Sequence, residues 1–477
     1  MAFYSPMIRF ELRSVQAHMI IRWTQQRAWI QRALTSIVAL AGACAVLAPG
    51  VAFAGGFSAP VRLPRFPEGE YAWSFAVNDR GQALAAADNR VYPVSPTGRL
   101  GRPWTFVAPD GGPEGITSLA LDDQGRVAIG LSYNDLSEVP EIAEHNSTCC
   151  WHAAVASWEL GTGAPVVQDL EPAGGQTSRN DEAQLGPEVA IGPTALTALW
   201  TEGGSSEAHL GEASGAPSEP LHERQLTSAA NGIQAIHLTL SPGGDPLAAW
   251  RLDTNEIATV KGSTSGKLPN PPPPQKAPGF TQDKGQQQEP PVTGEFSSDP
   301  QGDTLFTYLT GTFASHRRSA LAMTSTNGRQ FRRPRLLVRL GPGANTPTIV
   351  TGGNRALLLF WSCIAEIHTC ASTWARRTAI FGPLTAPLEV GAHPEGFIDS
   401  HGRTVIAYTR NHGIEAITAQ PGKPFGSPHR ISPPNSYCQL GPAGEGGESP
   451  QPSRNGAAIF YYSCESTERQ YLIRYTP

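Results

Sequence analysis

Short apolar runs alternate with tight polar turns along the chain from residue 55 to its end. The recurring pattern is an apolar run, a turn that ends in glycine, and a second apolar run. In one copy, residues 75–77 are followed by a turn that ends at Gly81 and then by the run 82–86. Runs of this length between turn residues predict β-strands joined as hairpins, because glycine supplies the positive φ that tight turns require.

The same hairpin pattern occurs eight times. The glycines at the equivalent turn position are Gly81, Gly125, Gly192, Gly244, Gly302, Gly353, Gly402 and Gly456. Their mean spacing is about 54 residues, longer than the repeats of familiar propellers. Each hairpin is followed by a third run and by a fourth that often contains proline, as in 100–106, 331–338 and 425–431. Proline suits an edge strand, so each unit predicts a four-stranded sheet with the fourth strand at its edge.

The two ends of this array complement each other. Residues 56–63 have the pattern of a fourth strand although no unit precedes them, and the last unit ends with a third strand at 471–475. Pairing of these two segments would close the array into a ring without exposed ends. The sequence therefore predicts an all-β fold, a β-propeller of eight four-stranded blades (alternatively seven), closed by the N-terminal strand.

Strands that alternate in direction sort the connections of such a ring onto two faces. The turn face carries the first-to-second and third-to-fourth turns, and the link face carries the second-to-third loops and the links between blades. The longest segments are predicted for the link face: 131–152, 169–187, 262–291 and 432–450. Binding residues are concentrated on elaborated loops, so we expect the ligand at the link face, with loop drift as the alternative.

One of these segments has a biased composition. Residues 264–291 are rich in proline and glutamine, which predicts a solvated loop within the propeller domain. No clear fourth strand is evident for the unit that precedes it, the fourth.

The N-terminal 54 residues have the pattern of a secretory signal peptide. A basic region and the apolar stretch 33–48 precede the cleavage pattern at 52–54, with Met19 as an alternative start. The stretch is short for a membrane span, and no other segment could cross a bilayer. We therefore expect a secreted, cell-surface or periplasmic protein in which residues 55–477 form one propeller domain.

Cleavage of this signal would leave six cysteines, an even number that suggests disulfides in an exported protein. They are Cys149, Cys150, Cys363, Cys370, Cys438 and Cys464. Cys363 and Cys370 lie across a short second-to-third loop, which makes a hairpin disulfide plausible. Cys438, in the predicted link before the last unit, is the expected partner of Cys464. Cys44 lies within the signal after a poor lipoprotein motif, and lipidation there stays an open alternative.

Cys149 and Cys150 belong to a segment that also contains His145 and His152. Two thiolates and two imidazoles are ligands that zinc or copper accepts. The spacing matches no zinc-finger pattern, and adjacent cysteines rarely both bind one tetrahedral ion. We therefore expect a disulfide here and no cofactor, with a metal site as the alternative.

Asp135, Glu138 and Glu141 lie in the same predicted loop, just before Trp151. Two carboxylates at the right separation could serve glycoside hydrolysis, although a solvated acidic loop is the simpler interpretation. These residues mark the candidate binding loops, and no catalytic residue is assigned, since the chain has no G-x-S-x-G, H-E-x-x-H or P-loop pattern. The net charge of -5 and the lack of a long basic run beyond the signal argue against nucleic acid as a partner.

Two short stretches resemble the sialidase-like (Asp-box) propellers of secreted bacterial proteins. Val61-Arg62-Leu63-Pro64 is similar to the Arg-Ile-Pro signature of that family, and 325–331 is similar to a shortened Asp-box turn. The first pattern recurs at 429–432 in another predicted outer strand, so Arg62 is interpreted as a repeat residue. No Tyr–Glu nucleophile pair or complete arginine triad can be placed, so the resemblance implies a fold and not an activity.

These patterns favour an exported, monomeric, non-catalytic binding or scaffold module. Its ligand, a glycan, a peptide or a protein, is expected at the link face. The alternative is a carbohydrate-active propeller, a hydrolase or lyase. An enzyme should bring carboxylate, histidine or arginine side chains together where the first strands of the blades approach the centre of the ring.

Overall fold

A computed structural model provides the fold. The chain divides into two compact units, Met1–Phe53 and Ala54–Pro477, and all of the described residues belong to the second unit. The structure describes residues 56–64, 73–107, 114–134, 151–161, 164–170, 186–202, 208–217, 219–229, 232–280, 294–298, 302–310, 318–340, 348–352, 356–361, 372–377, 388–390, 392–421, 423–434, 436–440, 452–464 and 469–477. No helix among these residues is long and apolar enough to cross a membrane.

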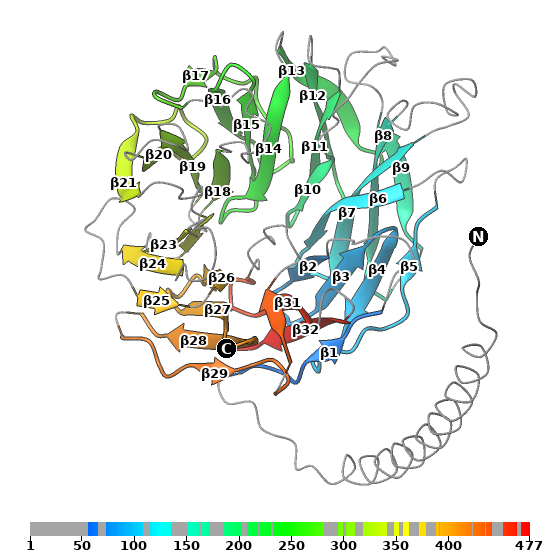
Figure 1. The fold of residues 1–477 in the computed structure, drawn as a ribbon. Helices are drawn as coiled ribbons and strands as arrows, with labels where there is room; N and C mark the ends of the chain where they lie inside the picture. Colours follow the sequence, from blue (N-terminus) through cyan, green and yellow to red (C-terminus); the bar gives the residue numbers. More distant parts are fainter. Residues whose placement is uncertain are drawn as a thin grey trace, which may run out of the picture. The chain divides into compact units, whose positions relative to one another are not determined.

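The described strands form eight four-stranded antiparallel sheets, which we number as blades 1 to 8 (Figure 1). Blades 1 to 4 are β2 (Ser74–Val77), β3 (Ala83–Ala87), β4 (Arg90–Val94) and β5 (Trp104–Thr105); β6 (Glu114–Leu121), β7 (Arg126–Asn134), β8 (Trp151–Glu159) and β9 (Val166–Leu170); β10 (Glu188–Ile191), β11 (Leu196–Glu202), β12 (Ala208–Gly215) and β13 (His222–Ala229); and β14 (Ile233–Leu240), β15 (Pro246–Leu252), β16 (Glu256–Lys261) and β17 (Gln275–Lys276).

The second half of the chain continues the same order. Blades 5 to 8 are β18 (Glu295–Ser298), β19 (Asp303–Thr310), β20 (Arg318–Thr326) and β21 (Arg335–Leu340); β22 (Thr348–Gly352), β23 (Ala356–Trp361), β24 (Ser372–Arg377) and β25 (Leu388–Val390); β26 (Ala392–Ile398), β27 (Thr404–Arg410), β28 (Gly413–Ala419) and β29 (His429–Arg430); and β30 (Cys438–Leu440), β31 (Ala458–Cys464) and β32 (Arg469–Tyr475) with β1 (Val61–Arg62) as the fourth strand.

Contacts between first strands close the blades into a ring. Each first strand from β2 to β26 contacts the first strand of the next blade, and β31 of blade 8 contacts β2 of blade 1. The first strands are therefore innermost and the fourth strands form the outer edges. This arrangement is the predicted β-propeller.

The N-terminal strand completes blade 8, as predicted. Val61 pairs with Leu472 in antiparallel register, and a bridge joins Phe57 to Tyr475. The ring of Phe57 is 5% exposed and lies 4.9 Å from that of Tyr475. Gly56 is required at the start of this strand because its φ is 84° and a Cβ there would lie 2.1 Å from the carbonyl oxygen of Thr476.

The core lies between the blades and is built from the second and third strands. Every residue of β3 is buried, and four of its five residues are alanines, which permits close packing of neighbouring sheets. Trp200 and Trp250 are each 1% exposed and pack against residues of the preceding blade. The glycine opposite Trp200, Gly211, leaves room for its indole, since a Cβ there would lie 2.4 Å from the ring.

Two of the predicted long links are wrong in their boundaries. The chain at 432–450 is not one link, because β30 (Cys438–Leu440) interrupts it and the following residues connect the first and second strands of blade 8. The segment 262–291 contains the fourth strand of blade 4, β17, so that 262–274 is a third-to-fourth connection and belongs to the turn face.

The first part of the proline-rich segment is mostly exposed, as predicted, but one of its residues is anchored in blade 3. Leu268 is fully buried, and its N–H donates to the Glu212 carboxylate at 2.6 Å. Arg224 forms an ion pair with the same carboxylate, at 2.6 Å, and donates to the Leu268 carbonyl. Composition therefore predicted the exposure of most of this segment but not the anchoring of Leu268 by an ion pair of blade 3.

Candidate functional site

The turn face is held together by hydrogen bonds between neighbouring blades. The Asn455 N–H donates to the Asp79 carboxylate at 2.8 Å, which joins the first-to-second turns of blades 8 and 1. The Asp79 N–H in turn donates to the Asp123 carboxylate of blade 2 at 2.9 Å. Arg403 of blade 7 donates to the Asn455 carbonyl. Polar side chains on this face are therefore used to connect turns.

One contact on this face crosses the ring. Arg454, in the turn of blade 8, donates to the carbonyl oxygen of Pro242, in the turn of blade 4, at 3.4 Å. Blades 4 and 8 are opposite each other in a ring of eight sheets. This contact joins the turns of opposite blades across the centre of the turn face.

A column of mostly polar residues occupies one position of the first strands, three residues before the last residue that pairs with the second strand. We call it the inner-ring position. Its members are Ser74 in β2, Ser118 in β6, Glu188 in β10, His237 in β14, Glu295 in β18, Ile349 in β22 and Glu395 in β26.

Three of these side chains bond to the next blade. Ser118 Oγ donates to the carbonyl of Pro187 at 2.8 Å, and the Glu188 carboxylate accepts from the N–H of Leu238 at 2.6 Å. His237 Nε2 lies 3.1 Å from Ser298 Oγ. Burial lowers the pKa of His237 to about 4, so the imidazole is neutral at pH 7. These residues connect the inner strands of blades 2 to 5.

The other two acidic members have no such partner. Burial raises the pKa of the Glu295 carboxyl to about 7 and that of Glu395 to about 8. Among the described residues, no hydrogen bond or ion pair reaches either carboxyl group. A protonated carboxyl near pH 7 is what a general acid needs, but blade 6 separates these two residues, so they do not lie on neighbouring strands.

The inner-ring residues were not predicted. Most of them interrupt short apolar runs, where a lone polar residue carries little information. Aligning the repeats on their turn glycines would have placed Ser74, Ser118, His237, Glu295 and Glu395 in one column, each seven residues before the glycine. Glu188 lies only four residues before Gly192, so this alignment would have missed it.

The expected binding loop falls outside the described residues. Asp135, Glu138, Glu141, His145, Cys149 and Cys150 all belong to it. Trp151 and His152 begin β8, where the imidazole stacks on Tyr133 at 5.3 Å and the Tyr133 hydroxyl donates to Asp169 at 3.0 Å. In the part of the chain that the structure describes, no three His, Cys, Asp or Glu side chains are grouped so that they could hold a metal.

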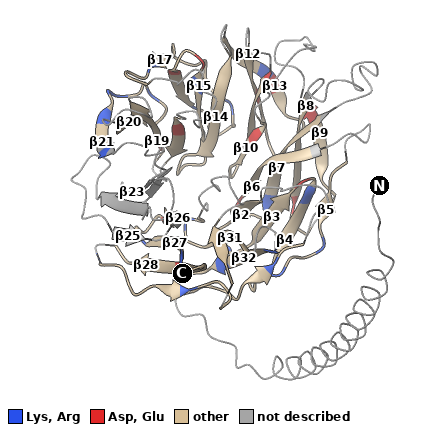
Figure 2. Cartoon of the chain, in the orientation of Figure 1, with Lys and Arg blue, Asp and Glu red and all other residues tan. Residues whose placement is uncertain are grey.

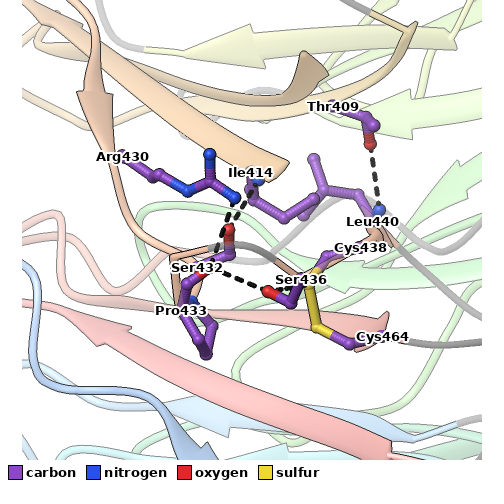
Figure 3. Close-up of a disulfide and its surroundings, with 9 residues drawn as sticks. All are labelled: Thr409, Ile414, Arg430, Ser432, Pro433, Ser436, Cys438, Leu440 and Cys464. Atoms are coloured by element: carbon purple, nitrogen blue, oxygen red, sulfur yellow. Dashed lines mark hydrogen bonds between the residues drawn. A yellow bond between two sulfur atoms is a disulfide. The ribbon is translucent and has the colours of Figure 1, made fainter. Parts of the chain in front are cut away.

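The disulfide between Cys438 and Cys464 is confirmed (Figure 3). Both cysteines are buried, in paired positions of β30 and β31 rather than in a link. The Cys438 N–H donates to the His412 carbonyl at 3.0 Å. Next to it, Tyr437 is 58% exposed and its ring lies 4.9 Å from the His412 imidazole on the link face. The other predicted pair, Cys363 and Cys370, lies outside the described residues.

The stretches that resemble sialidase motifs are structural. Arg62 is exposed in β1, and the similar Arg430 is exposed in β29, so both lie in outer strands as the repeat interpretation predicted. In the Asp-box-like turn, Ser325 is fully buried and donates to the Arg329 carbonyl. Gly328 packs on the preceding blade, since a Cβ there would lie 2.2 Å from the backbone nitrogen of Lys261 in β16.

No protein-family model matches the chain, and no curated protein does. Among solved structures, the polysaccharide lyase Uly1 is similar over 78% of this chain and 91% of its own, with 10% identity and a TM-score of 0.46. The BP39L lectin from Burkholderia pseudomallei is similar over 74% and 98%, with 11% identity and a TM-score of 0.40. The Hadza microbial sialidase Hz136 is similar over 69% and 74%, with 11% identity and a TM-score of 0.34. The propeller assignment itself rests on the strand pairing of this chain.

Proposed function

We propose that this protein is an exported, non-catalytic binding or scaffold propeller that contacts its ligand through the link face. The observation that supports this proposal is the asymmetry between the two faces. On the turn face, Asp79, Asn455 and Arg454 are engaged in bonds between blades, one of which crosses the centre. The link face instead carries the exposed pair Tyr437 and His412, which lie on the connection between blades 7 and 8 and on the second-to-third turn of blade 7.

Export is part of the same proposal. The Cys438–Cys464 disulfide is compatible with an oxidising compartment, and the segment 1–54 has the pattern of a signal peptide. Expression of the full chain with mass spectrometry of the exported product should give an N-terminus at Gly55. An uncleaved chain that remains inside the cell would contradict export.

The binding surface is tested with residues 55–477, screened on a glycan array and by panning a displayed peptide library. The ligand found is then titrated against Tyr437→Ser on the link face and Arg80→Ser, an exposed residue on the turn face. We expect the first substitution to weaken binding several-fold and the second to leave it unchanged, since an exposed aromatic ring next to a histidine contributes contact area at low entropic cost. If only Arg80→Ser weakened binding, the ligand would lie on the turn face, and the proposed link-face site would be refuted.

The alternative, a carbohydrate-active hydrolase or lyase, has one observation in its favour. Glu295 and Glu395 have raised pKa values near the pH at which a general acid works. Incubation with neutral and acidic polysaccharides, followed by a reducing-end assay, distinguishes the two functions. Product release that Glu295→Gln or Glu395→Gln abolishes in a folded protein would overturn the non-catalytic proposal.

A further inference from the structure

The outer edge of blade 5 carries a concentration of positive charge that the net charge of the chain conceals. Between Asp303 and Glu366 the sequence contains eight arginines and no acidic residue, although the whole chain has a net charge of -5. Five of these arginines are exposed along the turn before β21 and on β21 itself, where Figure 2 shows basic residues: Arg329, Arg332, Arg333, Arg335 and Arg339. We call them the arginine strip.

The geometry of the strip is that of an extended rod. β21 is the last strand of its sheet, so one of its edges has no strand partner among the described residues. From Arg332 to Arg339 the backbone is largely extended, and a rise of about 3.3 Å per residue gives a length of roughly 23 Å. Guanidinium groups at intervals along this length suit a linear polymer with regularly spaced negative charges, because each can bind a carboxylate or sulfate oxygen pair.

We propose that the arginine strip binds a linear anionic polysaccharide, carboxylated or sulfated. This surface is separate from the link face, and the proposal holds whether or not the proposed link-face function does. The occupant follows from charge complementarity and from what the strip lacks. Phe331, the only aromatic residue within 329–339, is 4% exposed, so no ring in this range is free to stack on nucleobases.

Addition of a peptide strand fits this edge less well. Pro334 has no N–H, and the pairing of β21 with β20 shifts between Val338 and Leu336, so Leu337 forms a bulge. Edge strands that accept a peptide need a regular row of backbone groups. A polymer that binds through its charges needs only the guanidinium groups.

The experiment measures binding of residues 55–477 to heparin and to polygalacturonate by titration at several salt concentrations. The test variant carries four changes to glutamine, at Arg332, Arg333, Arg335 and Arg339. The matched control removes the same charge from exposed arginines of blades 1, 7 and 8: Arg62, Arg80, Arg102 and Arg410. Because these side chains are exposed, both proteins should keep the unfolding midpoint of the parent, which is measured in parallel.

We expect the strip variant to bind at least one of the two polysaccharides roughly ten- to a hundred-fold more weakly than the parent, with a shallower salt dependence, and the control to lose much less. Equal losses in both variants would overturn the proposal, because the attraction would then come from total charge. Tighter binding of single-stranded DNA or of anionic vesicles than of either polysaccharide would also overturn it. Failure of the parent to bind either polymer, with aggregation of the strip variant, would show that the arginines only protect the edge strand.

Discussion

Glu395 offers a direct test of the energetic cost of an unpaired acidic group inside this ring. Its side chain is 8% exposed, and burial raises its pKa from 4.5 to about 8. Between those two values the folded protein binds the proton more tightly than the unfolded chain does. Stability is therefore complete below pH 4.5, falls as the pH rises through this window, and is lowest above pH 8.

The substitution Glu395→Gln removes this pH dependence and keeps the shape of the protonated side chain. A pKa difference of about 3.5 at 1.36 kcal/mol per pH unit gives a ceiling of roughly 5 kcal/mol. We expect the variant to match the parent at pH 4.5 and to be more stable by a few kcal/mol at pH 8.5. Glu295 is present in both proteins, so its own raised pKa cancels in the comparison.

The assay is urea unfolding of residues 55–477 at four pH values from 4.5 to 8.5, followed by tryptophan fluorescence. The control is Glu219→Gln, which removes one carboxyl from an exposed position. Unfolding midpoints of the Glu395 variant and the parent that stay parallel across the range would refute the reasoning. That result would mean that the carboxyl is ionised and solvated in the folded ring. Glu395 would then no longer be a candidate general acid.

Three further predictions concern what holds the ring together. Replacing both Cys438 and Cys464 with serine should cost about 3 kcal/mol of unfolding free energy, since the disulfide closes a loop with a sequence separation of 26; a midpoint that neither this change nor a reductant lowers would contradict it. Phe57→Ala should cost roughly 3–5 kcal/mol, as for other buried aromatic rings, and should sensitise the C-terminal strands to protease; unchanged cleavage would show that closure does not depend on this ring. Glu212→Gln should cost roughly 3 kcal/mol because it leaves Arg224 partly buried without its anion, and the double change to Leu at both positions should recover part of that loss; equal losses in the single and double variants would exclude the ion pair as the cause.

The sequence predicted the ring well because each blade repeats the same local signals. Turn glycines such as Gly81 and Gly456 mark the hairpins, and both have a positive φ in the structure. The pairing of the first strand with the last could be predicted because one end had a surplus strand and the other lacked one. These features depend on local turn chemistry and on counting strands, and neither requires knowledge of contacts between blades.

Details that depend on contacts between blades were less predictable. The pairing of Cys438 with Cys464 was predicted correctly but its location was not, because only three residues of β30 pair before the long connection begins. Leu268 was expected to be solvated because its neighbours are prolines, and its burial depends on an ion pair more than forty residues earlier in the chain. The Glu188 carboxylate bonds to the first strand of the next blade. To predict this contact one must know how the two first strands are aligned, and the composition of the chain does not show that.

The candidate site shows the same limit. Whole-chain charge hid the arginine strip, because the acidic residues that balance it lie elsewhere in the sequence. The acidic loop at 135–150 lies outside the described residues. Its expected role in binding therefore remains a prediction.

The shared closing blade also has a consequence for biosynthesis. The strand at 57–63 leaves the ribosome before any other part of the propeller, and its partner at 469–475 leaves last. Blade 8 therefore has no complete sheet until its third strand, β32, has been made, and a product that ends before this strand lacks the pairing with β1. Synthesis of β32 is thus a condition for closure of the ring, and a product that ends before it leaves blade 8 incomplete.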